Sequence, residues 1–353
     1  MKLYTRRVIS KSNLLVFNFA MDRNDPLLSH QYEAVDGLAK KYSNITVITG
    51  RVGKVTTNPK IQIISTNWVQ GHNIRNLLKL ALKAIPEIMH GDFQSVFFHM
   101  TDLQCALFSP LIRLRKRRQF LWYAHTFKSR YLIFASKWVT GVVTSTNGSC
   151  PLTGEIVWPI GQAIDEEKFR PIPFDVLDLN KLIHIGRFDK SKNINRLISS
   201  AEELRKSFSE IELTIIGSTA NKQSQNWANE LLLQSRQKVE MGWLSFKEAI
   251  PREEFSIEMA KNGCFFHCYL GSLDKTLIEA TMLCVPVVTL NPEYIEIFGT
   301  WSNKSFSDLE GEYRALRSLS EDEIRDELDK RLKIARERHS LHHWVDQLTA
   351  LLL

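Results

Sequence analysis

Residues 267–290 read HCYLGSLDKTLIEATMLCVPVVTL: an apolar strand ends, a polar loop follows, a helical pattern begins at about Lys275, and a second apolar strand closes the stretch. Two short apolar runs separated by a helix are typical of parallel strands with a crossover helix. Sheets of this kind bind ligands at the carboxyl ends of their strands, where the loop from Gly271 to Asp274 would lie. The stretch therefore predicts an α/β domain with a ligand site in that loop.

The same alternation of strand and helix patterns extends towards both ends of the chain. β-Branched and aromatic runs predict strands at 13–20, 44–49, 94–99, 119–124, 139–145, 182–185, 212–216, 264–270 and 286–290. Amphipathic patterns predict helices at 29–41, 74–89 and 102–116, and again from residue 320 onward. Between Trp158 and Pro173, prolines and glycines gather without periodicity. The pattern predicts two doubly wound, Rossmann-like α/β domains joined by one Pro-rich linker.

Length and composition exclude several classes of protein. The chain has 353 residues, enough for two domains with their own cores, and its 16 glycines and 11 prolines exclude a collagen-like or low-complexity chain. The five cysteines include no C-x-x-C pair, which favours free buried thiols in a reducing, cytoplasmic compartment. Residues 1–12 are basic but lead into no signal-peptide core, and no run approaches the ~18 to 20 apolar residues of a membrane span.

The charge is distributed unevenly along the chain. Counting Lys and Arg against Asp and Glu gives 21 minus 9 for residues 1–165 and 25 minus 30 for residues 166–353, so the halves carry +12 and −5. Such asymmetry suggests that the first half meets an anion, either a phosphate-bearing substrate or a lipid headgroup. The alternative is an ordinary solvated surface. Nucleic acid is not expected as a partner, because no recognition motif or aromatic platform accompanies the charge.

Two segments of the first half favour contact with an anionic membrane. Residues 74–85 form an amphipathic pattern with cationic positions, and Arg113 to Arg118 place five cations in six residues. We hypothesise that these segments dock on a membrane to reach a lipid-linked sugar, since basic residues near an anionic surface add ~1 kcal/mol each. A core helix followed by a solvated loop is the alternative.

The strand at 182–185 ends in residues suited to an anionic ligand. Gly186 follows the strand, and Arg187 and Lys192 come next in the sequence IHIGRFDKSKN. An arginine fork and a lysine point charge at a strand's carboxyl end suit a diphosphate. A common surface turn is the alternative for Gly186 and Arg187.

The loop of the opening stretch supplies a second set of candidates. Asp274 is expected to be the N-cap of the following helix, whose positive end and exposed amides favour an anion. Glu279 lies just beyond the first turn, where its carboxylate is suited to the hydroxyls of a nucleotide ribose. A solvated helix face is the alternative for a lone glutamate.

Taken together, these segments resemble the retaining glycosyltransferases of fold GT-B, family 4, which use nucleotide sugars. The resemblance covers most of the chain and is strongest from Gln119 onward. It rests on motifs in order and spacing: WYAH at 122–125, VTS at 143–145, PIGQAID with FRP at 159–171, IGR with KN at 185–193, LTIIG at 213–217, IEA with VPVV at 278–288, and HSLHHW at 339–344.

The resemblance implies a role for each candidate residue. Arg187 and Lys192, in the segment after Gly186, would bind the donor diphosphate and neutralise the leaving group, and Glu279 would hold the ribose. The backbone amides of Gly271, Ser272, Leu273, Asp274 and Lys275 would contact the sugar and phosphates. His125 would face the transferred sugar; without the resemblance, a satisfied core or strand-end histidine is the expected reading.

The resemblance also implies the domain organisation. We expect an acceptor-binding domain over 1–165, a nucleotide-sugar domain over 166–338, and a helix over 339–353 that packs back on the first domain. The two domains would face a central cleft and close on the donor about a hinge at 159–173, which would exclude water.

Two departures from the family pattern stand out. The family has Glu, seven residues, then Glu, and here the first of these positions is Gly271. We interpret this as altered donor recognition, with Asp274 and Lys275 the nearest substitutes. The Gly-Gly loop of the family is also absent from Phe19 to Leu28. Because no D-x-D occurs, metal-independent transfer without a cofactor is expected.

The implied reaction is hexose transfer from a UDP- or GDP-hexose to a hydroxyl of a glycan or lipid-linked acceptor, with retention. The resemblance places it in surface polysaccharide or glycolipid synthesis at the inner face of the membrane. A sugar-nucleotide epimerase of the same architecture is an alternative, which needs acid/base groups and no acceptor. A non-catalytic nucleotide-sugar-binding scaffold is another, because Gly271 replaces an acid.

Overall fold

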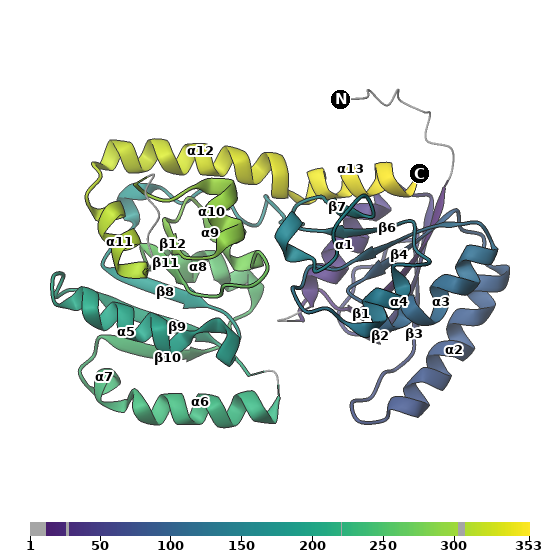
Figure 1. Cartoon of the computed structure of the whole chain (residues 1–353), viewed down its shortest axis with the longest axis horizontal. Coiled ribbons are helices and arrows are strands. Elements are labelled where there is room, and N and C mark those ends of the chain that lie inside the picture. Colours follow the sequence, from purple (N-terminus) through teal and green to yellow (C-terminus); the bar gives the residue numbers. More distant parts are fainter. Residues whose placement is uncertain (1–11, 26–27, 220, 303–307) are drawn as a thin grey trace. The chain divides into compact units, whose positions relative to one another are not determined.

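The computed structural model describes residues 12–25, 28–219, 221–302 and 308–353. The basic residues 1–11 and positions 26–27 of the segment Phe19–Leu28 lie outside the described residues. The chain divides into two compact units: residues 1–160 with 345–353, called unit 1, and residues 161–344, called unit 2 (Figure 1). The expected boundaries lay at 165 and 338, so the observed division differs by a few residues.

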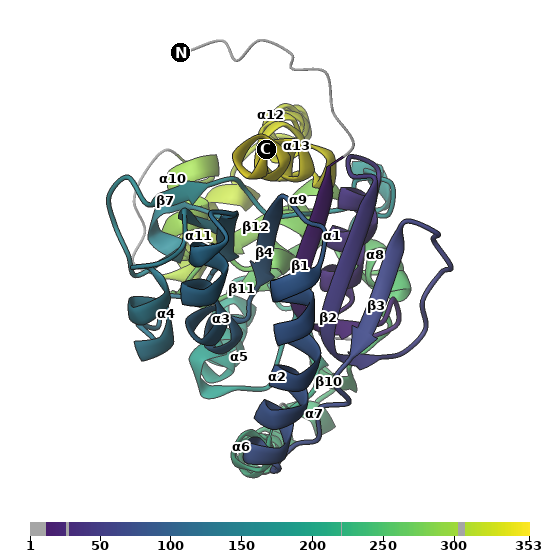
Figure 2. The ribbon, with the colours of Figure 1, turned by 90° about the vertical axis from the view of Figure 1, so that its right-hand side faces the viewer.

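Unit 1 is built on a parallel sheet of order β3-β2-β1-β4-β5-β6-β7 (Figure 2). Its strands are β1 (Asn13–Met21), β2 (Asn44–Val52), β3 (Ile61–Ser65), β4 (Ser95–His99), β5 (Arg118–Trp122), β6 (Gly141–Thr144) and β7 (Val157–Pro159). Its helices are α1 (Ser29–Ala39), α2 (Asn73–His90), α3 (Asp102–Leu114) and α4 (Arg130–Ala135). Central strands such as β4 are buried on both faces, as parallel sheets covered by helices require.

Unit 2 has a second parallel sheet, of order β10-β9-β8-β11-β12. Its strands are β8 (Lys181–Ile185), β9 (Glu212–Gly217), β10 (Leu244–Glu248), β11 (Cys264–His267) and β12 (Val287–Thr289). Its helices include α5 (Ile194–Arg205), α6 (Lys222–Gln234), α7 (Arg236–Glu240), α8 (Phe255–Ala260), α9 (Lys275–Met282), α10 (Pro292–Phe298), α11 (Leu309–Arg317) and α12 (Glu321–His339). The prediction of two doubly wound α/β domains is confirmed.

Three strands were missed by the sequence analysis. β3 and β10 are edge strands, with sequences IQIIS and LSFKE. An edge strand pairs on one side only and is partly exposed, so it carries polar residues that weaken the strand pattern. β7, with sequence VWP, occupies the start of the segment interpreted as a linker. Its proline ends the strand on the far edge, a position that tolerates a missing N–H.

The linker after β7 is tied to the junction between α12 and α13 (Leu341–Leu352). Ile164 N donates to His339 O (3.0 Å), and Leu341 N donates to Ile164 O (2.7 Å). Gly161 has a φ of +82°, and a Cβ there would lie 1.7 Å from Arg338 O. Only glycine fits this crossing without strain.

Helix α13 runs mostly within unit 1, where it contacts Lys41, just after α1, and Arg118 of β5. Lys41 pairs with Asp346 (2.7 Å), and Arg118 Nη1 donates to Leu351 O (3.0 Å). The expected free, buried thiols are confirmed, because all five cysteines are buried and unbridged. Among the described residues, no helix is both long and apolar enough to cross a bilayer.

Candidate functional site

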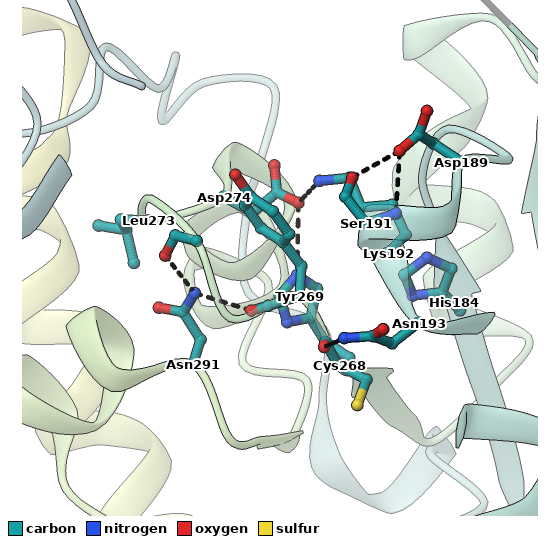
Figure 3. Close-up of polar contacts among 12 residues, drawn as sticks. His184, Asp189, Ser191, Lys192, Asn193, Cys268, Tyr269, Leu273, Asp274 and Asn291 are labelled. Atoms are coloured by element: carbon teal, nitrogen blue, oxygen red, sulfur yellow. Dashed lines mark hydrogen bonds and ion pairs between the residues drawn. The ribbon is translucent and has the colours of Figure 1, made fainter. Parts of the chain in front are cut away.

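The loops after β8 and β11 bring Lys192 and Asp274 together, with Tyr269 beside them (Figure 3). After β8 the chain turns through Asp189, whose carboxylate accepts from Ser191 N (2.9 Å), into the short 3-10 helix Lys190–Lys192. Asn193 adopts a left-handed conformation, φ 51°, and its Nδ2 donates to Cys268 O (3.1 Å). This bond ties the loop after β8 to the loop after β11, as Figure 3 shows.

Lys192 is the enclosed cation of this site. It is only 5% exposed, forms an ion pair with Asp274, and its Nζ lies 3.9 Å from the centre of the Tyr269 ring. A carboxylate and an aromatic face both attract an ammonium group, and their attraction grows where water is excluded. Lys192 is therefore held in one place.

Asp274 stands at the N-cap position of α9, as expected, but its side chain does not cap the helix. The carboxylate instead pairs with Lys192 and lies 3.3 Å from His267 Nε2. Burial alone would raise the pKa of Asp274, yet Lys192 and His267 outweigh it and hold that pKa well below its usual range. The expected capping role is thus wrong for the side chain, because a partly buried charge gains more from an ion pair than from one amide.

His267 links Asp274 to the end of β12. The ring is fully buried, with Nδ1 3.0 Å from Thr289 Oγ1 and Nε2 facing Asp274. Because the ionised Asp274 carboxylate can only accept, Nε2 carries the ring proton, and the Thr289 hydroxyl, which itself accepts from Asn291 N (3.1 Å), donates to Nδ1. Burial lowers the pKa of His267, and the neutral ring then carries its proton on Nε2 and donates it to Asp274.

Hydrogen bonds to its backbone carbonyl groups hold the loop before α9 in place. Asn291 Nδ2 donates to Tyr269 O (2.9 Å) and to Gly271 O (3.1 Å), and Gln162 Nε2 donates to Leu273 O (2.8 Å). Ser272 and Leu273 are buried, while Lys275 is half-buried. The proposed contacts of the amides of 271–275 with a donor stay a prediction.

Tyr269 occupies the space next to Gly271. A Cβ at position 271 would lie 2.1 Å from Tyr269 Oη and 2.2 Å from Cζ. The tyrosine ring therefore fills the place of any side chain at 271, which gives a physical reason for the glycine at this position. Asp274 and Lys275 were expected to substitute for the missing acid, but Tyr269, two residues before Gly271, is the residue that fills this space.

Glu279 is fully buried and pairs with Arg252 of the 3-10 helix Arg252–Glu254. The alternative of a solvated helix face is therefore wrong. Arg252 also lies over the Phe169 ring, 5.7 Å from its centre. Sequence reasoning missed Arg252, because nothing in the local sequence connects it to a residue so far along the chain.

Arg187 and His125 are exposed. Arg187 follows Gly186 directly after β8, on the same strand end as Lys192. His125 belongs to unit 1, in the loop after β5, where its Nδ1 accepts from Phe127 N (3.0 Å). A core position for His125 is thus wrong, and a strand-end position is observed.

No group of three or more His, Cys, Asp or Glu side chains among the described residues is placed to hold a metal ion. The polar groups that these contacts join are one cation, Lys192, a carboxylate, a phenol and a neutral histidine. Such a set suits a phosphate-bearing ligand bound by side chains and backbone.

The comparisons with known proteins concern the family of one part of the chain and the fold of the whole. The family model of Glycosyl transferases group 1 matches residues 165–336. HepE (Alr3699) of Anabaena, solved in complex with UDP and glucose, is 14% identical, with 97% of this chain and 99% of that chain covered and a TM-score of 0.73. Sucrose-phosphate synthase from Thermosynechococcus elongatus is 12% identical, with 96% and 98% covered and a TM-score of 0.68.

A glycosyltransferase from Rickettsia africae is 10% identical over 97% of this chain and 98% of that chain, with a TM-score of 0.68. No curated protein matches the sequence significantly. Residues 165–336 thus match the model of Glycosyl transferases group 1, and the chain as a whole shares the fold of these solved structures, two parallel-sheet α/β domains of the GT-B type.

Proposed function

We propose that the protein is a glycosyltransferase that moves a hexose from a nucleoside diphosphate sugar to an acceptor hydroxyl, with retention of configuration. The observation that carries the proposal is the group 1 match, which spans the elements from β8 to α9 that hold Arg187, Lys192 and Glu279. HepE, of similar fold, has been solved with UDP and with UDP-glucose. A UDP-hexose is therefore the first donor to test, ahead of a GDP-hexose.

In this proposal Arg187 and Lys192 stabilise the departing diphosphate. Negative charge grows on the diphosphate as the sugar becomes oxocarbenium-like, so cations already in position stabilise the transition state more than the ground state. Lys192 is fixed by Asp274 and Tyr269 and needs little reorganisation. Asp274 balances the charge of Lys192, and the exposed Arg187 is a further cation in the loop after this strand.

The remaining roles follow the same proposal. Glu279, oriented by Arg252, holds the ribose hydroxyls, and the amides of residues 271–275 contact the phosphates and sugar. Tyr269, next to Gly271, takes the space that an acid side chain would need. His125 is assigned to the transferred sugar, and transfer is metal-independent.

The acceptor is a glycan or a lipid-linked sugar, in surface polysaccharide or glycolipid synthesis at the inner face of the membrane. Within Arg113 to Arg118, only some of the cations are proposed to contact the membrane, because others already bond to backbone carbonyl groups. Arg115 donates to Ile88 O and Gly91 O, and Arg118 donates to Leu351 O. Arg113 and Lys116 of this segment are exposed, with no such bond to a backbone carbonyl, and they are the better candidates for lipid headgroups.

Donor turnover by the full chain tests the proposal. We expect the wild type to release UDP from UDP-glucose, and phosphorus NMR measures this release. When an acceptor hydroxyl is supplied, an α-linked product should form. Lys192→Met should lower this rate by about 100-fold or more, since one lost transition-state donor costs that much. Lys247→Met removes a lysine that pairs with Glu258 in the same unit and should leave the rate unchanged.

Three outcomes would contradict the proposal. Incorporation of solvent deuterium into the donor sugar, without transfer, would identify an epimerase. Binding of a UDP- or GDP-hexose with neither transfer nor release of the nucleotide would identify a non-catalytic scaffold, and failure of all of them to bind would contradict the proposed donor.

A further inference from the structure

Helix α2 exposes large apolar side chains to solvent. Ile74, Leu78 and Leu82 are 79%, 60% and 75% exposed, and Ile85 and Met89 are also exposed. An ordinary surface helix turns such residues towards the core. The helix is nevertheless anchored in unit 1, because a different set of its residues is buried: Asn76, Leu80, Ala84 and Ile88.

The geometry of an α-helix separates three faces on α2. At 100° per residue, the exposed apolar residues share an arc of about 80°, next to the buried face. The adjoining arc on the other side carries the cations Arg75, Lys79 and Lys83. The single acid of the helix, Glu87, falls on neither arc. The outward surface of α2 is thus an apolar stripe with a cationic flank.

The basic segment at the end of α3 adjoins this helix. Arg115 reaches the carboxyl end of α2, where it donates to Ile88 O (2.7 Å) and Gly91 O (3.0 Å). Its neighbour Leu114 is 79% exposed, and Arg113 and Lys116 are exposed as well. Figure 2 shows α2 on the outer side of unit 1, towards the viewer. The stripe and flank of α2, together with Arg113, Leu114 and Lys116, are called the α2 surface below.

We infer that the α2 surface docks on the headgroup region of an anionic lipid bilayer, with the stripe inserted and the cations facing the lipid phosphates. Aliphatic side chains with adjoining Lys and Arg are the pattern of helices that lie in a membrane interface. The +12 charge of residues 1–165 favours the same partner. A protein partner is less well matched, because the stripe has none of the aromatic anchors typical of protein interfaces.

The inference rests on the membrane contact of the proposed function. It extends that contact from Arg113 to Arg118 to the whole α2 surface. It does not depend on the chemistry of unit 2. The docked helix would hold unit 1 at the membrane, where a lipid-linked acceptor is presented.

Co-sedimentation of the full chain with vesicles tests the inference. We expect binding to vesicles of phosphatidylcholine with phosphatidylglycerol in a 7:3 ratio and much weaker binding to pure phosphatidylcholine. Lys79→Gln with Lys83→Gln should weaken binding to the anionic vesicles roughly 10- to 30-fold, as expected for two cations. Leu78→Ser with Leu82→Ser should weaken it roughly 10-fold or more.

A matched control lies on α6 of unit 2, where Leu232 and Leu233 are also exposed. Leu232→Ser with Leu233→Ser should bind vesicles like the wild type. A second readout uses Leu78→Cys carrying an environment-sensitive fluorophore, whose emission should shift to the blue only with anionic vesicles. UDP binding should be the same in all these variants, which separates this test from that of the proposed function.

Wild-type protein that does not sediment with anionic vesicles would overturn the inference. The same holds if both α2 double variants sediment like the wild type. A dimer of the wild type that dissociates in Leu78→Ser with Leu82→Ser, without vesicle binding, would assign the α2 surface to a second copy of the chain instead.

Discussion

Tyr269 and Gly271 form a pair in which one residue leaves room for the other. A methyl group at 271 would collide with the Tyr269 phenol, which lies over Lys192. We expect Gly271→Ala to lower the free energy of unfolding by ~1 to 3 kcal/mol, because the tyrosine must leave its place. In a Tyr269→Ala background the same change should be nearly neutral, and the coupling should appear in a double-mutant cycle of urea unfolding. Strictly additive effects would show that the ring does not occupy this space.

Two buried histidines of unit 2 make its stability depend on pH. Burial lowers the pKa of His184 and of His339 to about 3, while an unfolded histidine titrates near 6.5. Below pH 6.5 the unfolded chain therefore takes up protons that the folded chain refuses, and each histidine costs ~1.4 kcal/mol per pH unit as the pH falls. Glu312, whose pKa burial raises to about 7, acts in the opposite direction.

Substitution of His184 isolates one of these contributions. Between pH 6.5 and 5, the free energy of opening at β8 and β11 should fall less steeply in His184→Gln than in the wild type, by ~1.4 kcal/mol per pH unit. Hydrogen exchange of peptides covering these strands, corrected for intrinsic rates, measures the slope. His342→Gln changes an exposed histidine of the same unit and should leave it unchanged. Equal slopes in all three proteins would refute the assignment.

At the scale of elements, the crossing of the linker with the end of α12 depends on Gly161. We expect Gly161→Ala to destabilise unit 2 by more than ~2 kcal/mol, because it adds a backbone clash with Arg338 O to the strain of a positive φ. Gly154 also has a positive φ, 91°, but a Cβ there has no neighbour within 4 Å. Gly154→Ala should therefore cost only ~1 kcal/mol. Similar thermal unfolding shifts for the two variants would contradict this.

The central elements could be predicted because each carries a clear local pattern. The strands at 13–20 and 212–216 are apolar runs, and α9 begins at Lys275 as expected. The edge strand β10 has no such pattern, since its residues LSFKE are partly solvated. The side chain of Asp274 was assigned a local role as a cap, whereas its partner Lys192 comes from 82 residues earlier in the chain. Contacts of that kind depend on the sheet order, which the sequence does not display.

For the molecule as a whole, the candidate site residues also divide into those that could be predicted from the sequence and those that could not. Arg187, Lys192 and Glu279 could be selected because motifs and strand ends mark them. Tyr269, Arg252 and the pair His267–Thr289 could not, since their importance lies in what they touch. The uneven charge of the chain was visible from the start, but only the exposure of α2 shows where a membrane-facing surface could form.

Calorimetric titration of the full chain with UDP tests the central claim, that unit 2 binds a nucleoside diphosphate sugar through Glu279. We expect the wild type to bind UDP and Glu279→Gln to bind about 10- to 100-fold more weakly, because hydrogen bonds to a charged acceptor contribute ~1.5 to 3 kcal/mol. Glu258→Gln changes another buried, ion-paired acid of the unit and should bind like the wild type. No heat with UDP, GDP or ADP, or unchanged binding in Glu279→Gln, would contradict the claim.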